Sequence, residues 1–386
     1  MTFETLALCA AVGLFGPLLA LPRGLRIPVV IGELVAGIAF GHTGFGVIDP
    51  SEQTLSFLAQ VGFALVMFVA GSQVPIRDPR LRIALGVGAA RAVTVGLLAT
   101  ALGWVVSAAF DAPHLGLYAV LMASSSAAVI MPIVESTTMT APGLMALLPQ
   151  IALADAVCIV ALPLVVDPPR AVPAALGSAA VIAAAALTFV VLRHFDITGL
   201  RRRIHHVSAQ RKLALELRLN LVLLFGLAAL AVHTHASVML AGFGFGLAVG
   251  AIGEPRRLTK QLFAITEGFL GPLYFVWLGA SLDLRALGDH PDMIVLGLAL
   301  GFGAIAVHGA MRLTGQPVGL GILAAAQLGV PVSAVTLGAQ SGVLAPGEGP
   351  AIVLGALVTI AAAAAASRLA LVVLRDPAGP RAAQGI

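Results

Sequence analysis

The chain has 386 residues, of which 59% are hydrophobic and 10% are charged, and its formal net charge at pH 7 is +4. A soluble domain cannot bury so large a share of apolar side chains, so the composition excludes an ordinary globular protein and indicates one that lies in a lipid bilayer. Its two cysteines, Cys9 and Cys158, both fall in apolar runs, which excludes a disulfide framework and any regular metal-ligand spacing.

Apolar runs follow one another along almost the whole chain. Because a helix needs about 20 apolar residues to cross the hydrocarbon, these runs predict an all-α polytopic membrane protein of about 13 transmembrane helices. They form one transmembrane domain, 1–376, followed by a short cytoplasmic tail, 377–386. The first run has no basic leader, so we expect a retained helix rather than a cleaved signal. The expected spans lie near 3–21, 28–46, 54–71, 81–109, 114–135, 143–166, 172–192, 213–232, 236–252, 260–281, 292–313, 317–343 and 350–374.

The basic residues of the connections indicate how the chain is oriented. Thirteen spans with the N-terminus outside put the basic connection 193–212, which we expect to be a loop, in the cytoplasm together with the C-terminus. Only Arg170 and Arg285 among the basic connecting residues then face outward, as the positive-inside rule requires. The sequence pI near 9.7 therefore reports orientation in a cell inner (cytoplasmic) membrane, and we expect no nucleic-acid partner.

Two charged residues lie inside the early spans. Glu33, in the second run, fits either a site residue or an acid that reaches back to the membrane surface. Arg91 lies in the middle of the fourth run, where a charge needs a partner. Asp155 or Glu267 would serve as that partner, and a tie to backbone carbonyls is the alternative.

Two of the runs are expected to be interrupted helices. In the fifth run Ser124, Ser125 and Ser126 are followed by Pro132, and the twelfth run contains Gly329 and Pro331. Proline removes a backbone donor and clashes with the preceding turn, which frees carbonyl groups. Such carbonyls can bind a cation where they line a cavity. The alternative is a pair of merely kinked helices.

Asp155 is the single ionisable residue in the run 143–166. A carboxylate at membrane depth costs about 2.5 to 3.5 kcal/mol on insertion scales unless it faces water or a partner, so function is the default interpretation. Burial favours the protonated acid and a bound cation favours the ionised one, so protons and a cation would compete for Asp155. The alternative is an aspartate that ties two helices together as part of the packing.

An internal repeat is present at an offset of about 209 residues. "IGELVAGIAFG" (31–41) aligns without gaps with "LAGFGFGLAVG" (240–250), and "MFVAGSQV" from Met67 aligns with "FVWLGASL" from Phe275. Glycine-rich helices can resemble one another by chance, but two matches at nearly one offset favour a true repeat.

The two halves, approximately 28–166 and 236–374, are expected to be inverted because an odd number of spans separates each matching pair. Inverted repeats are a transporter architecture, with the site near the midplane where interrupted helices meet.

Four stretches carry a resemblance to a known family. "PVVIGELVAGIAFG" (28–41), "MFVAGSQV", "SSSAAVIMPIVE" (124–135) and "YFVWLGASLD" (274–283) resemble, in order and spacing, motifs of the monovalent cation:proton antiporters, the branch with Kef-type potassium and NapA-type sodium exchangers. The resemblance implies an NhaA/NapA-like inverted repeat with two broken, crossing helices. It implies exchange of Na⁺ or K⁺ for H⁺ by alternating access at Asp155, no cofactor, and a homodimer.

Several positions depart from the family pattern. Ala154 stands where the family often has a polar residue before the aspartate, and Val330 stands where Kef-type proteins have Glu, although Gln327 is retained. His308 falls where the family has Lys or Arg. It would compete with the cation or tune Asp155, or else it is an interfacial histidine. Glu267 is a second-tier site candidate. The choice between Na⁺ and K⁺ and the stoichiometry stay open.

Other functions were weighed against antiport. A sodium-coupled symporter of a small anion on a related inverted-repeat fold is the main alternative, and a passive channel is a weaker one. A membrane protease would need a second mid-membrane aspartate or a Ser–His pair. Asp155 has no such aspartate partner in the sequence, so we expect no enzyme.

Overall fold

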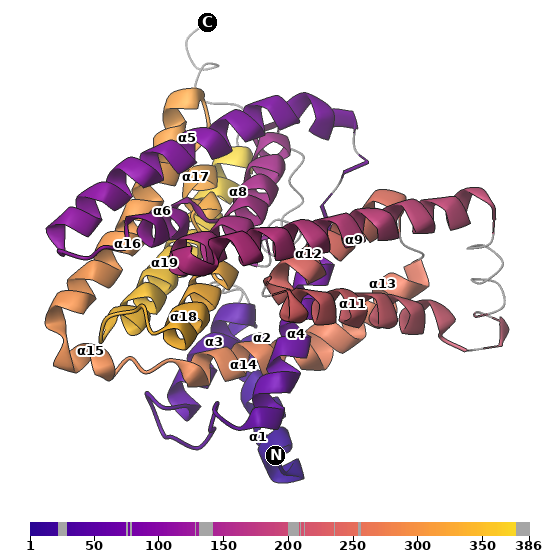
Figure 1. Ribbon diagram of the computed structural model, residues 1–386, viewed down its shortest axis with the longest axis horizontal. Coiled ribbons are helices and arrows are strands. Elements are labelled where there is room, and N and C mark those ends of the chain that lie inside the picture. Colours follow the sequence, from indigo (N-terminus) through magenta and orange to yellow (C-terminus); the bar gives the residue numbers. More distant parts are fainter. Residues whose placement is uncertain are drawn as a thin grey trace, which may run out of the picture.

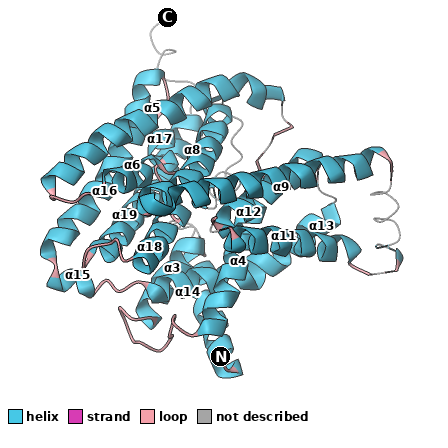
Figure 2. Cartoon of the chain, in the orientation of Figure 1, coloured by secondary structure: helices cyan, strands magenta, loops and turns pink. Residues whose placement is uncertain are grey.

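The structure, a computed structural model, describes residues 1–21, 29–74, 76–77, 79–127, 129–130, 142–199, 208, 210–211, 213–234, 236–253 and 256–375. These residues form helices and short connections and contain no strand (Figure 2). The predicted tail 377–386, Pro132 and half of the 193–212 connection (200–207, 209 and 212) lie outside the described residues.

The helices follow the apolar runs closely. In the first half they are α1 (Phe3–Gly13), α2 (Phe15–Ala20), α3 (Val29–Phe40), α4 (Gln53–Ser72), α5 (Pro79–Ala109), α6 (Leu115–Ala123), α8 (Pro142–Val166), η1 (Pro168–Arg170) and α9 (Ala171–Ile197). In the second half they are α11 (Leu215–His233), α12 (Val238–Ile252), α13 (Arg256–Ile265), η2 (Thr266–Leu270), α14 (Gly271–Ser281), α15 (Ala286–Asp289), α16 (Pro291–Gly309), η3 (Ala310–Thr314), α17 (Val318–Ala324), α18 (Gly329–Ser341) and α19 (Glu348–Arg375).

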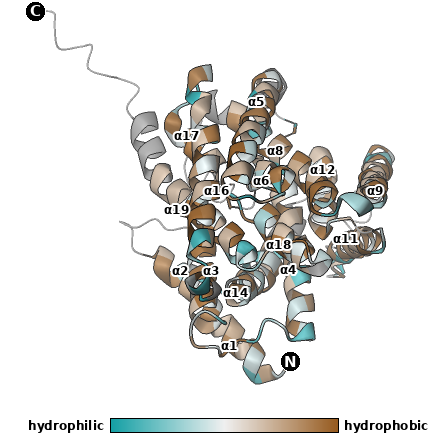
Figure 3. Ribbon diagram, turned by 60° about the vertical axis from the view of Figure 1, so that its left-hand side comes forward, coloured by the Kyte–Doolittle hydropathy of each residue, from teal (hydrophilic) through white to brown (hydrophobic). Residues whose placement is uncertain are grey.

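By length and composition, ten helical segments in the described residues could cross a membrane, and α3 and α12 are shorter apolar helices. In Figure 3 brown or pale ribbon predominates along most of the labelled helices. Many large apolar side chains are exposed, as suits a protein with lipid as solvent. The chain is thus an all-helical polytopic membrane protein. Three of the thirteen predicted spans are not among these ten, because α3, α12 and the described part of α6 are each too short.

One predicted boundary is wrong. The connection 193–212 was expected to be a loop from its first residue, but α9 continues to Ile197 and includes Arg193 and His194. Hydropathy marks where the chain leaves the hydrocarbon, whereas a helix can continue into water because its backbone hydrogen bonds are internal.

The helices form two bundles. In the first, α4 packs on α12 and α14, and α3 packs on α14 and α2, with α9 and α11 against α12. In the second, α5, α6, α8, α16, α17, α18 and α19 pack on one another. Figure 1 shows the second bundle on the upper left and the first bundle along the bottom and right. Contacts of α8 with α9 and α12 are among those that join them.

Glycines allow very close packing at two places in the first bundle. A Cβ atom at Gly37 of α3 would lie 2.3 Å from the carbonyl oxygen of Val276 in α14. A Cβ at Gly246 of α12 would lie 2.2 Å from the carbonyl oxygen of Phe68 in α4. These residue pairs match each other at the offsets found in the sequence, so α3 packs on α14 as α12 packs on α4.

Two arginines make contacts that match in the same way. Arg77, after α4, donates through Nε to the carbonyl of Ala251 at the end of α12 (2.8 Å). Arg285, after α14, donates through Nε to the carbonyl of Thr43, beyond the end of α3 (2.7 Å). Carbonyl groups at and just beyond the C-terminal end of a helix have no N–H partner within that helix, and each guanidinium supplies one of them with a donor.

Candidate functional site

Two interruptions of helical structure meet inside the second bundle. The first lies at Ser124–Ser126, where α6 ends and Ser124 adopts an extended conformation. The second lies at 325–328, between α17 and α18. Ser124 Oγ lies 3.1 Å from Gln327 Oε1, and Ser125 Oγ donates to the carbonyl of Ala324 at 2.6 Å. The serines thus join the two breaks directly.

The second break differs from the sequence prediction in its position. Gly329 and Pro331 were expected to mark the interruption, but helical structure stops at Ala324 and resumes at Gly329, so that both residues lie in the first turn of α18. A proline is tolerated there because the first N–H groups of a helix have no intrahelical acceptor. Pro132, expected to mark the first break, lies outside the described residues.

Asp155 lies in α8 beside the first break and is 2% exposed. Its Oδ2 accepts a hydrogen bond from the backbone N–H of Ala127 at 3.1 Å. Helical hydrogen bonding resumes at this point, since the N–H of Ile130 donates to the carbonyl of Ser126. The carboxylate therefore meets the N-terminal end of a new helical turn, where a free N–H and the helix dipole favour negative charge.

Ser126 and Gln327 complete the polar surroundings of the two breaks. Both are buried. The backbone N–H of Gln327 donates to Oγ1 of Thr359 in α19 at 3.3 Å. Thr359 was not singled out from the sequence, because a lone threonine in an alanine-rich helix carries no signal.

His308, in α16, is fully buried at the same level as the first break. Its ring lies against the backbone carbonyls of Met122, Ala123 and Ser124 at the end of α6. Neither ring nitrogen has a hydrogen bond of ordinary geometry to the described residues. The side chain is therefore inside the second bundle and not at an interface with water.

Arg91 lies apart from both acids proposed as its partner. Its Nε donates to Thr314 Oγ1 at 2.9 Å, and its Nη2 donates to the Thr314 carbonyl at 3.1 Å. Thr314 ends η3, the short helix that follows α16. Among the described residues, the hydrogen bonds of Arg91 are thus those of a cation that caps a helix end.

Glu33 and Glu267 lie in the first bundle, away from Asp155. Glu33 is buried, with its side chain packed on Gly16 of α2. Glu267 lies in η2, a π-helical turn that interrupts the helix between α13 and α14. The two carboxylates are close enough to repel each other electrostatically. In the sequence, Glu33 and Glu267 were site candidates because they are acids in apolar runs, and that property does not reveal which bundle they belong to.

The donor set around Asp155 suits a monovalent cation. Carboxylate, hydroxyl and backbone carbonyl oxygens gather at the two breaks, and hard cations prefer oxygen ligands. Within the described part of the chain, no three His, Cys, Asp or Glu side chains cluster as a transition-metal site would require.

The comparisons with known proteins agree on one class. Residues 10–370 match the profile of the family described as "Sodium/hydrogen exchanger, transmembrane". A fold comparison finds the sodium proton antiporter MjNhaP1 from Methanocaldococcus jannaschii with a TM-score of 0.68 and 14% identity. That match covers 98% of this chain and 99% of the other.

Curated relatives with similar sequences are potassium-efflux proteins. The glutathione-regulated potassium-efflux system protein KefC of Enterobacter sp. (strain 638) is 28% identical over 310 residues, which is 78% of this chain and 48% of KefC. The KefC of Salmonella newport (strain SL254) is 29% identical over 318 residues, 78% of this chain and 49% of the relative. The chain thus spans about half the length of these relatives.

Proposed function

The chain belongs to the sodium/hydrogen exchanger family, and from that premise we propose that it exchanges a monovalent cation for protons across the inner membrane, by alternating access at Asp155. The observation that carries the proposal is the position of Asp155: a carboxylate buried in α8, at the point where two interrupted helices meet. The names of the similar proteins include both sodium and potassium, so the cation is Na⁺ or K⁺.

Asp155 would hold the cation and the proton in turn. Oδ2 is engaged by the Ala127 N–H, which leaves Oδ1 as the cation ligand, together with oxygens of Ser124–Ser126. When the cation leaves, the buried carboxylate loses its counter-charge and takes up a proton, because an isolated charge is costly in this environment. Because Asp155 cannot hold the cation and the proton together, a site that opens to each side of the membrane in turn would exchange one for the other.

The remaining buried groups have supporting roles in this proposal. Gln327 holds Ser124 from the second break. His308 faces the carbonyls at the end of α6, where a protonated imidazole would oppose a cation and a neutral one would not. Arg91 is a positioning residue for the end of η3. Glu33 and Glu267 lie in the first bundle and would act on its packing or gating.

The broken, crossing helices of an NhaA/NapA-like inverted repeat are part of the same proposal. The matching glycine contacts of α3 with α14 and of α12 with α4 support two related halves. So do the matching caps made by Arg77 and Arg285. The orientation with the basic connection 193–212 and the C-terminus in the cytoplasm follows from the positive-inside rule, and a homodimer follows from family resemblance alone.

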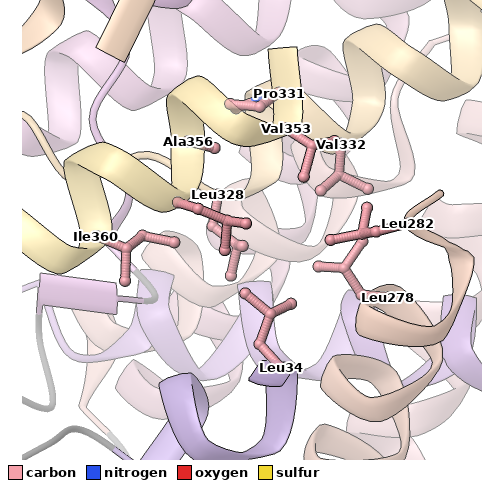
Figure 4. Close-up of a pocket in the computed structure, with 10 residues that line it drawn as sticks. Leu34, Leu278, Leu282, Leu328, Pro331, Val332, Val353, Ala356 and Ile360 are labelled. Carbon is pink, nitrogen blue, oxygen red and sulfur yellow. The ribbon is translucent and has the colours of Figure 1, made fainter. Parts of the chain in front are cut away.

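The contact between the two bundles supports movement of one against the other. An apolar pocket lies there, lined from the first bundle by Leu34, Leu278 and Leu282 and from the second by residues such as Leu328 and Val332 (Figure 4). Apolar contacts have no preferred direction, so they can be exchanged for similar contacts with less cost than hydrogen bonds. Such a contact suits alternating access.

The test is exchange by purified protein in proteoliposomes that contain a pH-sensitive dye. A gradient of Na⁺ or K⁺ should move protons without any added anion, and Asp155→Asn should abolish that movement. Asp167→Asn is the matched control, since Asp167 follows the same helix and pairs with the exposed Arg170; it should retain exchange. Full exchange by Asp155→Asn would refute the proposal. A strict requirement for an anion would favour the sodium-coupled symporter instead.

A further inference from the structure

A second buried acid lies outside the site around Asp155. Glu348, the first residue of α19, is 1% exposed. Its Oε1 lies 2.7 Å from His114 Nδ1 and accepts a hydrogen bond from the Tyr118 hydroxyl at 2.8 Å. Its Oε2 accepts the backbone N–H of Ala345 at 2.8 Å. We refer to His114, Tyr118 and Glu348 as the outer cluster, because in the proposed orientation this end faces outward.

The outer cluster connects the beginnings of two helices that lead to the site. His114 is the N-cap residue of α6, which ends at Ser124 and the first break. Glu348 begins α19, whose Thr359 accepts the backbone N–H of Gln327 in the second break. A change in the distance between His114 and Glu348 is therefore passed along two rigid helices to both breaks.

The opposite end of the second bundle has a similar tie made of uncharged groups. Gln316, just before α17, donates through Nε2 to Gln150 Oε1 of α8 at 3.1 Å. Both glutamines are buried. An amide pair thus suffices to join a half-helix to its neighbour. The outer cluster joins the half-helix α6 to α19 with an acid and a base instead of two amides. Packing alone does not require ionisable groups here, and they make the contact sensitive to pH.

His114 is the group that protons from water can reach. Its side chain is 13% exposed, whereas that of Glu348 is 1% exposed. The Nδ1 atom can donate to Glu348 in the neutral ring and in the charged ring, but only the charged ring makes an ion pair. Histidine changes charge between about pH 5 and pH 8. A proton added to the ring would therefore turn this hydrogen bond into an ion pair.

Other titratable groups near the outer cluster are few and mostly exposed. His290, on the connection before α16, packs beside Gly347, the neighbour of Glu348. Asp111, before α6, and Asp289 and Asp292, on either side of His290, are exposed. None of these is placed to replace His114 at Glu348 Oε1.

We propose that the outer cluster is a second proton-binding site, distinct from Asp155, through which the pH outside sets the rate of exchange. A proton bound by His114 pairs it with Glu348, holds the outer ends of α6 and α19 together, and makes the opening of the breaks to the outside slower. Loss of that proton loosens the contact and speeds exchange. The inference rests on the proposed function.

The experiment measures exchange in proteoliposomes at a saturating cation concentration, with the pH of the outer side varied. Competition at Asp155 changes the KM for the cation, whereas the outer cluster changes the maximal rate. Between pH 8 and pH 6 the maximal rate of the wild-type protein should fall by about three- to tenfold, the effect of a partly buried ion pair. His114→Gln, which keeps a hydrogen-bond donor, should reduce this fall to less than about twofold.

Two further variants and a second readout complete the test. Glu348→Gln should flatten the profile as His114→Gln does. His233→Gln is the matched control, since His233 is exposed at the end of α11, and should keep the wild-type profile. In detergent, the difference in melting temperature between the wild type and His114→Gln should increase in favour of the wild type as the pH is lowered from 8 to 6.

The outcomes separate this inference from the proposed function. If the wild-type protein shows no Asp155-dependent exchange, the proposed function fails, and the melting curves still test proton binding at His114. If exchange occurs but His114→Gln and Glu348→Gln keep the wild-type pH profile, the outer cluster has only a structural role and the inference is overturned.

Discussion

Ser124 and Gln327, 203 residues apart in the chain, lie 3.1 Å apart between Oγ and Oε1. Each belongs to an interruption of a helix, and neither interruption lies at a proline in the described residues. The Ser124 hydroxyl also lies 2.9 Å from the carbonyl of Leu121, so its single proton serves one acceptor at a time. The contact makes the geometry of one break depend on the other.

Gln327→Leu should therefore weaken cation binding while the protein stays folded. The leucine has a similar volume but removes the hydrogen bond across the breaks, at a cost of about 0.5 to 1.5 kcal/mol, because Ser124 can still donate to the Leu121 carbonyl. We expect the KM for the cation to rise about tenfold in a proteoliposome exchange assay, which is about 1.4 kcal/mol. Gln327→Glu, which keeps an acceptor, should be affected less. An unchanged KM for Gln327→Leu would show that the contact does not position the site.

Gly37→Ala and Gly246→Ala should destabilise the protein by similar amounts. An added Cβ would overlap a backbone carbonyl at both sites, at 2.3 Å and 2.2 Å, and a backbone cannot move aside as a flexible side chain can. Overpacking of this kind costs about 1 to 3 kcal/mol or more. Melting temperatures in detergent would measure the loss.

The control for these variants is Gly226→Ala in α11, where nothing lies within 4 Å of the added atom. Alanine favours a helix over glycine by about 1 kcal/mol, so this variant should be as stable as the wild type or more stable. A large difference between Gly37→Ala and Gly246→Ala would argue against equivalent packing in the two halves.

Leu278→Trp should slow exchange without unfolding the protein. Leu278 lines the apolar pocket between the two bundles, and a larger side chain there would fill the pocket and interlock the facing surfaces (Figure 4). We expect the maximal rate to fall several-fold and the melting temperature to fall moderately, because Leu278 is 2% exposed and the larger ring overpacks its surroundings. Leu187→Trp is the control, because Leu187 is exposed on α9 and faces no other helix closely. Equal rates for the two variants would argue against movement at this contact.

The sequence by itself determined that the protein lies in a membrane, where most helices run, which segments resemble each other at an offset of about 209 residues and which acid is alone in an apolar run. These properties are local: hydropathy is summed over about 20 neighbouring residues, and the period and glycine spacing of a helix can be read along one segment. The same local rules place Asp155 at membrane depth without any knowledge of its neighbours.

Only the tertiary structure decided which groups meet. It placed the second break at 325–328 rather than at Pro331, paired Arg91 with Thr314 rather than with Asp155 or Glu267, and brought His114 to Glu348. Each of these depends on how helices from distant parts of the chain pack, because a charged side chain at membrane depth takes whichever partner packing brings within hydrogen-bond reach. Residue spacing along a single helix contains no information on that choice.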